Sequence, residues 1–245
     1  MFIGLTNLSY KKISFINLTK KLNENSINYI EAAPSLLNKN FDKNKKLIKK
    51  VLNKNKIKII SLQSIFFKCK KININSYDDF FYLINHFKKI VKFCYYLNVK
   101  NISLGSCPSR KEISNKKKLY EYNLKLFSKF AEIAYSKNIF LNIEPISKKY
   151  QNFFLNNSHQ ALKFIKKIKR KNLKLVLDTG NCKNEKVNFK SFFLKNKHFI
   201  GHIQISDKNI KSLKIEEANK NFVHKNLKFI HNDAFSIKPF KVDII

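Results

Sequence analysis

Two carboxylates stand where apolar runs of strand composition end, and they are the residues of this chain best placed to do chemistry. Glu144 closes the run FLNIE, and Asp178 closes the run LKLVLD. A charge is costly inside a sheet, so an acid at the point where a buried strand emerges is expected to be paired, to bind a cation or to transfer a proton. The plain alternative is a structural ion pair, because ion-pair networks also gather acids at strand ends.

Strand-like runs alternate with helix-like segments along most of the chain. The runs are expected at 2–6, 28–32, 57–62, 101–104, 139–144, 173–178, 199–206 and 234–238. Apolar residues spaced by three and four fill the segments between most of them. Eight βα repeats in 245 residues predict a single domain, 1–245, folded as an α/β (β/α)8 TIM barrel. Because the sequence stops at Ile245, soon after Lys238, we expect the last helix to be missing.

An open, doubly wound sheet is the alternative architecture. That architecture usually has a glycine-rich turn after its first strand, but the sequence LTNLS at residues 5–9 contains no glycine. The chain also lacks the patterns GxGxxG and GxxxxGKS/T, which argues against the usual dinucleotide and nucleoside-triphosphate sites.

The polar residues that end the other runs are candidates for the rest of a site, because a barrel gathers its chemistry at the C-terminal ends of its strands. Glu31 and Gln63 are expected either to bind substrate hydroxyl groups or to anchor loops. Arg110 ends a proline-containing turn and fits either an anion clamp or a solvated loop residue. His202 lies deeper in its strand, where it is either a contact for substrate or metal or a core histidine with one partner.

The formal net charge of +34 first suggests a polyanion partner such as nucleic acid or an anionic membrane surface. Nearly all of this charge is lysine, however, because Arg110 and Arg170 are the only arginines. A lysine-rich chain that is also rich in Asn, Ile, Phe and Tyr is typical of drift towards A/T-rich codons. Nucleic-acid readers favour arginine for bidentate contacts. We therefore expect neither nucleic acid nor a membrane to be the partner.

Cysteine usage and apolar patterning indicate the compartment. The four cysteines are far apart and form no CxxC pair, which argues against a disulfide framework and a structural zinc site. No run reaches the roughly 18 apolar residues that a membrane span needs. The N-terminal lysines follow a short apolar run, which is the reverse of a signal peptide. We expect the protein to be cytoplasmic.

Six short motifs resemble, in chain order, the strand ends of one family. They are IEAAPS, SLQSIFF, LGSCPSR, IEP, LDTGN and GHIQIS. The chain is similar over nearly its whole length to the sugar phosphate isomerase/epimerase branch of the xylose-isomerase-like TIM barrels. That resemblance implies a divalent metal (Mn²⁺, Mg²⁺ or Zn²⁺) held by Glu, Asp, His and Glu at the ends of strands five to eight. In such barrels the two Glu also move the substrate proton.

Carried over residue by residue, the resemblance is complete at Glu144 and Asp178 and altered at two other positions. Gln204 stands where the histidine ligand is expected, and Lys238 stands where the second Glu is expected. An amide oxygen can ligate a hard cation, whereas a protonated lysine repels one. The implied metal ligands are therefore Glu144, Asp178 and Gln204. The implied catalytic pair is Glu144 and Lys238, with Lys238 as a fixed cation that stabilises an enediolate.

Three functions are consistent with these residues, in this order. The first is a sugar or sugar-phosphate isomerase or epimerase that transfers a proton at a carbon next to a carbonyl. The second is an inactive barrel, or one that binds a carbohydrate-like ligand without turnover, because the changes at 204 and 238 also fit relaxed selection. The third is a metal-dependent phosphodiesterase like the apurinic-site endonucleases. That enzyme needs a cluster of several His, Glu and Asp, which the six histidines are not distributed to supply.

Overall fold

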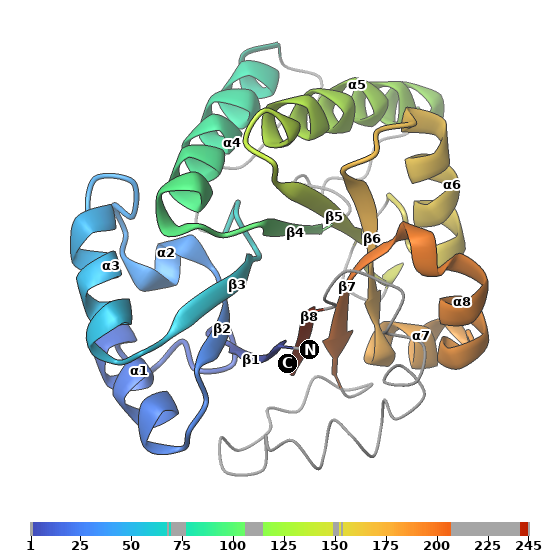
Figure 1. Ribbon diagram of the computed structural model, residues 1–245. Coiled ribbons are helices and arrows are strands. Elements are labelled where there is room, and N and C mark those ends of the chain that lie inside the picture. The colour runs from blue at the N-terminus through green and yellow to red at the C-terminus, as the bar shows by residue number, and fades with distance from the viewer. Residues whose placement is uncertain are drawn as a thin grey trace.

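The computed structural model describes residues 2–67, 69, 77–105, 115–148, 152 and 154–206 and the backbone of 241–244. Parallel strands form a closed barrel in chain order, and the last strand pairs with the first. Figure 1 shows the strands at the centre and the helices around them. The predicted TIM barrel is therefore confirmed. The strands are β1 (Phe2–Thr6), β2 (Tyr29–Ala32), β3 (Lys58–Leu62), β4 (Asn101–Gly105), β5 (Phe140–Glu144), β6 (Leu173–Asp178), β7 (Ile200–Ile205) and β8 (Lys241–Ile244).

The helices lie on the outside of the barrel, between successive strands (Figure 1). None of the described helices is long and apolar enough to cross a membrane. The described residues contain no helix after β8. The helices are α1 (Phe15–Glu24), α2 (Pro34–Leu37), α3 (Lys45–Lys54), α4 (Tyr77–Leu97), α5 (Lys116–Tyr135), α6 (Ser158–Ile168), α7 (Thr179–Glu185) and α8 (Phe189–Asn196), with a 3-10 turn at Lys197–Phe199.

The eighth strand lies further along the chain than the sequence-based prediction placed it. We expected a strand at 234–238, and the structure has β8 at Lys241–Ile244. Residues 241–244 pair in parallel with a strand on each side. Val242 pairs with Ile3 of β1 and with Ile203 of β7, and this double pairing closes the barrel. Residues 207–240, which include Lys238, lie outside the described residues.

The apolar core lies between the strands and the helices that cover them. Alternate residues of β5, Leu141 and Ile143, are fully buried, as expected for strand positions that face the helices. In the surrounding layer, Phe87 of α4 stacks on Phe130 of α5 with ring centroids 4.3 Å apart. This packing holds the strands in a fixed ring and so fixes the positions of the residues at their ends.

Gly201 of β7 lies where a side chain has no room. A Cβ atom added there would overlap with Oδ1 of Asn142 and lie 2.7 Å from Cβ of Lys174. We expect Gly201→Ala to lower the free energy of unfolding by about 2 kcal/mol, measured by urea denaturation. Gly105→Ala is the matched control, because its Cβ would meet only the flexible end of Ile146. If Gly201→Ala lowers the free energy of unfolding no more than Gly105→Ala does, the close packing around Gly201 is contradicted.

Candidate active site

Glu144 ends β5 and lies beside Gly105 of β4 in the parallel register. The residue is partly exposed, but protein atoms surround its carboxyl group. Burial, together with the negative charges of Asp178 and Glu31, raises the pKa of Glu144 to about 8, while His202 acts in the opposite direction. Near neutral pH the carboxyl group therefore holds a proton and titrates close to the working range of a general acid or base.

Asp178 ends β6 and also caps helix α7. Its Oδ1 accepts a hydrogen bond from the backbone N–H of Asn181, which satisfies one free donor of the helix start, and another from Oγ of Ser206 at 2.9 Å. Burial raises the pKa of Asp178 to about 6 even though these hydrogen bonds favour the charged form. Oδ2 is buried and has no hydrogen-bond partner among the described residues. One carboxylate oxygen therefore fixes the side chain, and the other is free to bind a ligand.

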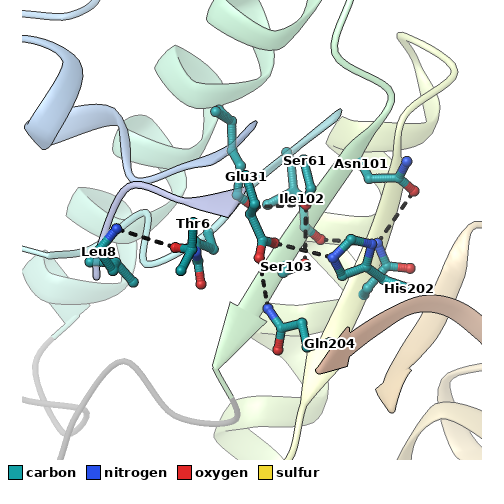
Figure 2. Close-up of polar contacts among 12 residues, drawn as sticks. Thr6, Leu8, Glu31, Ser61, Asn101, Ile102, Ser103, His202 and Gln204 are labelled. Carbon is teal, nitrogen blue, oxygen red and sulfur yellow. Dashed lines mark hydrogen bonds and ion pairs between the residues drawn. The ribbon is translucent and has the colours of Figure 1, made fainter. Parts of the chain in front are cut away.

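A buried polar cluster joins β2 to β7 across the barrel interior. These strands are not neighbours in the barrel, so the contacts between their side chains must cross its interior. Nε2 of Gln204 donates to Oε2 of Glu31 at 2.9 Å, and Nε2 of His202 lies 3.4 Å from Oε1 of Glu31. Figure 2 shows His202 and Gln204 both directed at the Glu31 carboxylate. None of the three residues is exposed to solvent.

The charge of Glu31 is stabilised within this cluster. Burial is the largest single effect and raises the pKa of Glu31, but the charge of the nearby His202 imidazole and several hydrogen bonds together outweigh it. Hydrogen bonds from His202, Gln204 and Ser103 act in the same direction, so the pKa is below its ordinary value. Glu31 is therefore ionised near neutral pH, in contrast to Glu144.

The residues predicted to bind substrate occupy different environments. Glu31 and His202 contact each other and are fully buried, so neither presents a surface to a substrate in this structure. Gln63 follows β3, is buried, and donates its amide N–H to Oγ1 of Thr6. Arg110, like Lys238, lies outside the described residues.

The predicted metal ligands come together at the ends of three consecutive strands. Asp178 and Gln204 are direct partners in the β6–β7 register, and Glu144 is close enough to Asp178 for their charges to interact. Oε1 of Gln204, like Oδ2 of Asp178, is buried without a hydrogen-bond partner among the described residues. Carboxylate and amide oxygens are donors that Mg²⁺ and Mn²⁺ prefer. These residues therefore fit a hard divalent cation.

The Gln204 amide adds to the donors that the described residues offer. Within the described ranges, no group of three or more His, Cys, Asp and Glu side chains is arranged to hold a metal ion. In this part of the chain the donor set therefore consists of the carboxylates of Glu144 and Asp178 and Oε1 of Gln204.

Two residues have supporting roles that the sequence reasoning did not assign. Ser206 holds Asp178, and the side chain of Asn181 donates to the carbonyl oxygen of Pro145 at 2.9 Å. The second contact ties the start of α7 to the residue that follows Glu144, so it links the two acid-bearing strand ends. A signal for Ser206 was available, because it stands two residues after Gln204 and residues two apart in a strand share a face.

Several solved structures share this fold. D-psicose 3-epimerase with D-tagatose, from Clostridium cellulolyticum H10, has a TM-score of 0.76 at 16% identity, covering 100% of this chain and 84% of that chain. 3-Keto-D-glucoside 4-epimerase from E. coli, in its apo form, has a TM-score of 0.77 at 14% identity, covering 99% and 91%. The IOLI protein with a bound zinc atom has a TM-score of 0.71 at 17% identity, covering 99% and 88%. At these identities the likeness shows the fold alone.

Comparison of the sequence itself gives the family. No curated protein sequence matches the chain significantly. The family profile of the xylose isomerase-like TIM barrels matches residues 19–229, which is most of the chain and includes Glu31, Glu144, Asp178 and Gln204. The chain therefore belongs to the xylose isomerase-like TIM barrel family.

Proposed function

We propose that this protein is a sugar or sugar-phosphate isomerase or epimerase that transfers a proton at a carbon next to a carbonyl. The observation that carries the proposal is Glu144, a partly exposed carboxyl group at the end of β5 whose pKa is raised to about 8. A base that titrates near neutral pH can both remove a proton from carbon and return it. The sugar epimerases among the structural neighbours support this reading of the site.

Each residue of the site has a distinct role in the proposal. Glu144, in its ionised form, takes the proton from the substrate carbon and later returns it. Asp178 and Gln204, with Glu144, would hold a divalent cation such as Mn²⁺ or Mg²⁺. When bound, that cation supplies positive charge that polarises the substrate carbonyl and lowers the cost of the enediolate. Lys238, assigned from its place in the sequence, adds a second positive charge for the same intermediate.

The number of proton-transferring groups decides which product forms. If Glu144 alone moves the proton between two neighbouring carbons, the transfer stays on one face of the substrate and gives the isomeric aldose or ketose. Inversion at one carbon needs a second group on the opposite face, and we propose that the protonated amine of Lys238 donates the returning proton there, while Glu144 keeps the proton that it removed. The ratio of isomer to epimer among the products therefore reports on whether Lys238 takes part in proton transfer.

The proposal is tested by incubating the purified protein with Mn²⁺ and a panel of ketoses and ketose phosphates that includes D-fructose and D-tagatose, with chromatography of the products. We expect saturable conversion of at least one member to an isomer or epimer, and loss of that conversion in Glu144→Gln. Saturable binding of sugars without conversion of any panel member would favour a carbohydrate-binding barrel instead. Nicking of abasic DNA without sugar turnover would favour the phosphodiesterase reading.

A further inference from the structure

The orientation of the Gln204 side chain is determined by its partner. A glutamine amide presents a donor at one end and an acceptor at the other, and a rotation of 180° exchanges them. Here Nε2 donates to Oε2 of Glu31 at 2.9 Å, so this carboxylate oxygen is the acceptor of the bond. The reversed amide would place two acceptor oxygens against each other. Glu31 therefore selects the orientation in which Oε1 of Gln204 is left without a hydrogen-bond partner among the described residues.

Glu31 is held by contacts at both of its carboxylate oxygens. Nε2 of His202 lies 3.4 Å from Oε1 of Glu31, on the other side from Gln204, and all three residues are completely buried. The three side chains therefore form a chain of contacts from His202 through Glu31 to Gln204, and this chain fixes the oxygen that receives the Gln204 N–H.

We propose that Glu31 is a positioning residue: it holds Nε2 of Gln204 so that the amide oxygen, and not the amide nitrogen, is presented to the divalent cation of the proposed isomerase. This inference rests on the proposed function, because it concerns the cation that Glu144 and Asp178 would share with Gln204. This positioning role applies only to an amide ligand, because the two ends of an amide differ. An amide in the wrong orientation places N–H groups with partial positive charge towards the cation and cannot ligate it.

Mn²⁺ affinity in a double-mutant cycle tests the inference. We expect Glu31→Gln to weaken Mn²⁺ binding by about 10- to 100-fold, the usual effect of removing a group that orients a ligand. In a Gln204→Ala background the same Glu31→Gln change should alter the affinity by less than about 3-fold, because there is no amide left to orient. A long-range effect of the lost negative charge would instead persist in both backgrounds, and that result would overturn the inference.

Thr19→Val is the matched control for this cycle. Thr19 is also fully buried, but it lies on α1, and its Oγ1 donates to the carbonyl oxygen of Ile16 in the same helix at 2.9 Å. Valine keeps the shape of the side chain and removes only this local contact, so Mn²⁺ affinity should be unchanged. A loss of affinity in Thr19→Val as large as in Glu31→Gln would show that general disturbance of the interior weakens the site, and would also overturn the inference.

A second measurement applies to the wild-type protein and does not need the Glu31 variant to fold. The chain has glutamines at 63, 151, 160 and 204 only, so selective ¹⁵N labelling gives few side-chain amide signals. We expect small additions of Mn²⁺ to broaden the Gln204 signal, assigned through Gln204→Ala, before that of Gln160 in α6. Binding of Mn²⁺ without this early broadening would overturn the inference.

The outcomes also separate this inference from the proposed function. Mn²⁺ binding that depends on Glu31 through Gln204, without turnover of any sugar, would leave the inference standing and remove the isomerase proposal. Sugar turnover, together with an Mn²⁺ affinity that is unchanged in Glu31→Gln, would support the isomerase proposal and overturn the inference about Glu31. If wild type binds no Mn²⁺, the inference is overturned whether or not sugars are converted.

Discussion

Glu144→Gln is expected to lower sugar turnover by about 10³-fold at saturating Mn²⁺. Glutamine keeps the shape of the side chain and an oxygen donor, but it cannot accept a proton from carbon and give it back. Glu144 is the partly exposed acid at the strand ends whose pKa, at about 8, suits that exchange. Initial rates of product formation for wild type and variant measure the effect, and circular dichroism checks that the variant is folded.

Glu132→Gln serves as the control for the loss of one carboxylate. Glu132 lies on the exposed face of α5, where it accepts a hydrogen bond from Lys129 at 2.7 Å, so its replacement should leave turnover unchanged. A loss below about 10-fold in Glu144→Gln would mean that another group moves the proton. Lys238 would then be the first residue to test.

The metal-free protein is expected to lose stability as the pH rises from about 5 to about 8. Folding raises the pKa of Glu144 from 4.5 to about 8, and that of Asp178 from 3.8 to about 6. For each residue, at a pH between its unfolded pKa and its folded pKa, the unfolded chain has released the proton and the folded chain still holds it. Their contribution to stability is therefore fully present below the unfolded pKa and is lost as the pH rises through the folded pKa. Glu31, whose pKa is lowered, acts in the opposite direction only at more acidic pH.

Urea denaturation across this range, with a chelator present, measures the effect and its source. In wild type we expect Glu144 alone to contribute a decrease on the order of 2 to 4 kcal/mol, from about 1.4 kcal/mol for each unit of pKa shift with allowance for partial exposure. In Glu144→Gln this part of the slope should disappear, so that the variant is more stable than wild type at alkaline pH and similar to it near pH 5. If the free energy of unfolding falls equally with pH in the two proteins, the charged form of the Glu144 carboxyl group is not destabilised by folding.

Much of the fold could be predicted because a buried strand leaves a local signal. The run LKLVLD predicted β6 with the bounds that the structure shows, since its alternate leucines and terminal acid mark both the core face and the strand end. The eighth strand lacked such a mark. The segments 234–238 and 241–244 both have strand composition, and what identifies 241–244 as β8 is its pairing with β1 and β7. That pairing depends on partners about 40 and 240 residues away in the sequence.

The candidate site could be predicted in part, for a similar reason. The convergence of Glu144, Asp178 and Gln204 follows from the rule that the ends of parallel strands meet at one edge. The contacts of Glu31 with His202 and Gln204 do not follow from that rule. They depend on how deep each side chain lies in the barrel and on which strands face each other across its interior. The sequence therefore left open whether Glu31 and His202 contact substrate, and the structure buries the two side chains against each other.

Exchange of substrate hydrogen with solvent is the most direct measurement of proton transfer by Glu144. Wild type and Glu144→Gln, each with Mn²⁺, would be incubated with the sugar panel in D₂O, and proton NMR would follow the hydrogen on the carbon next to the carbonyl. We expect wild type to replace this hydrogen with deuterium for at least one sugar, and Glu144→Gln to leave it in place. Exchange at equal rates in both proteins, or no exchange of any sugar by wild type, would contradict the proposed chemistry.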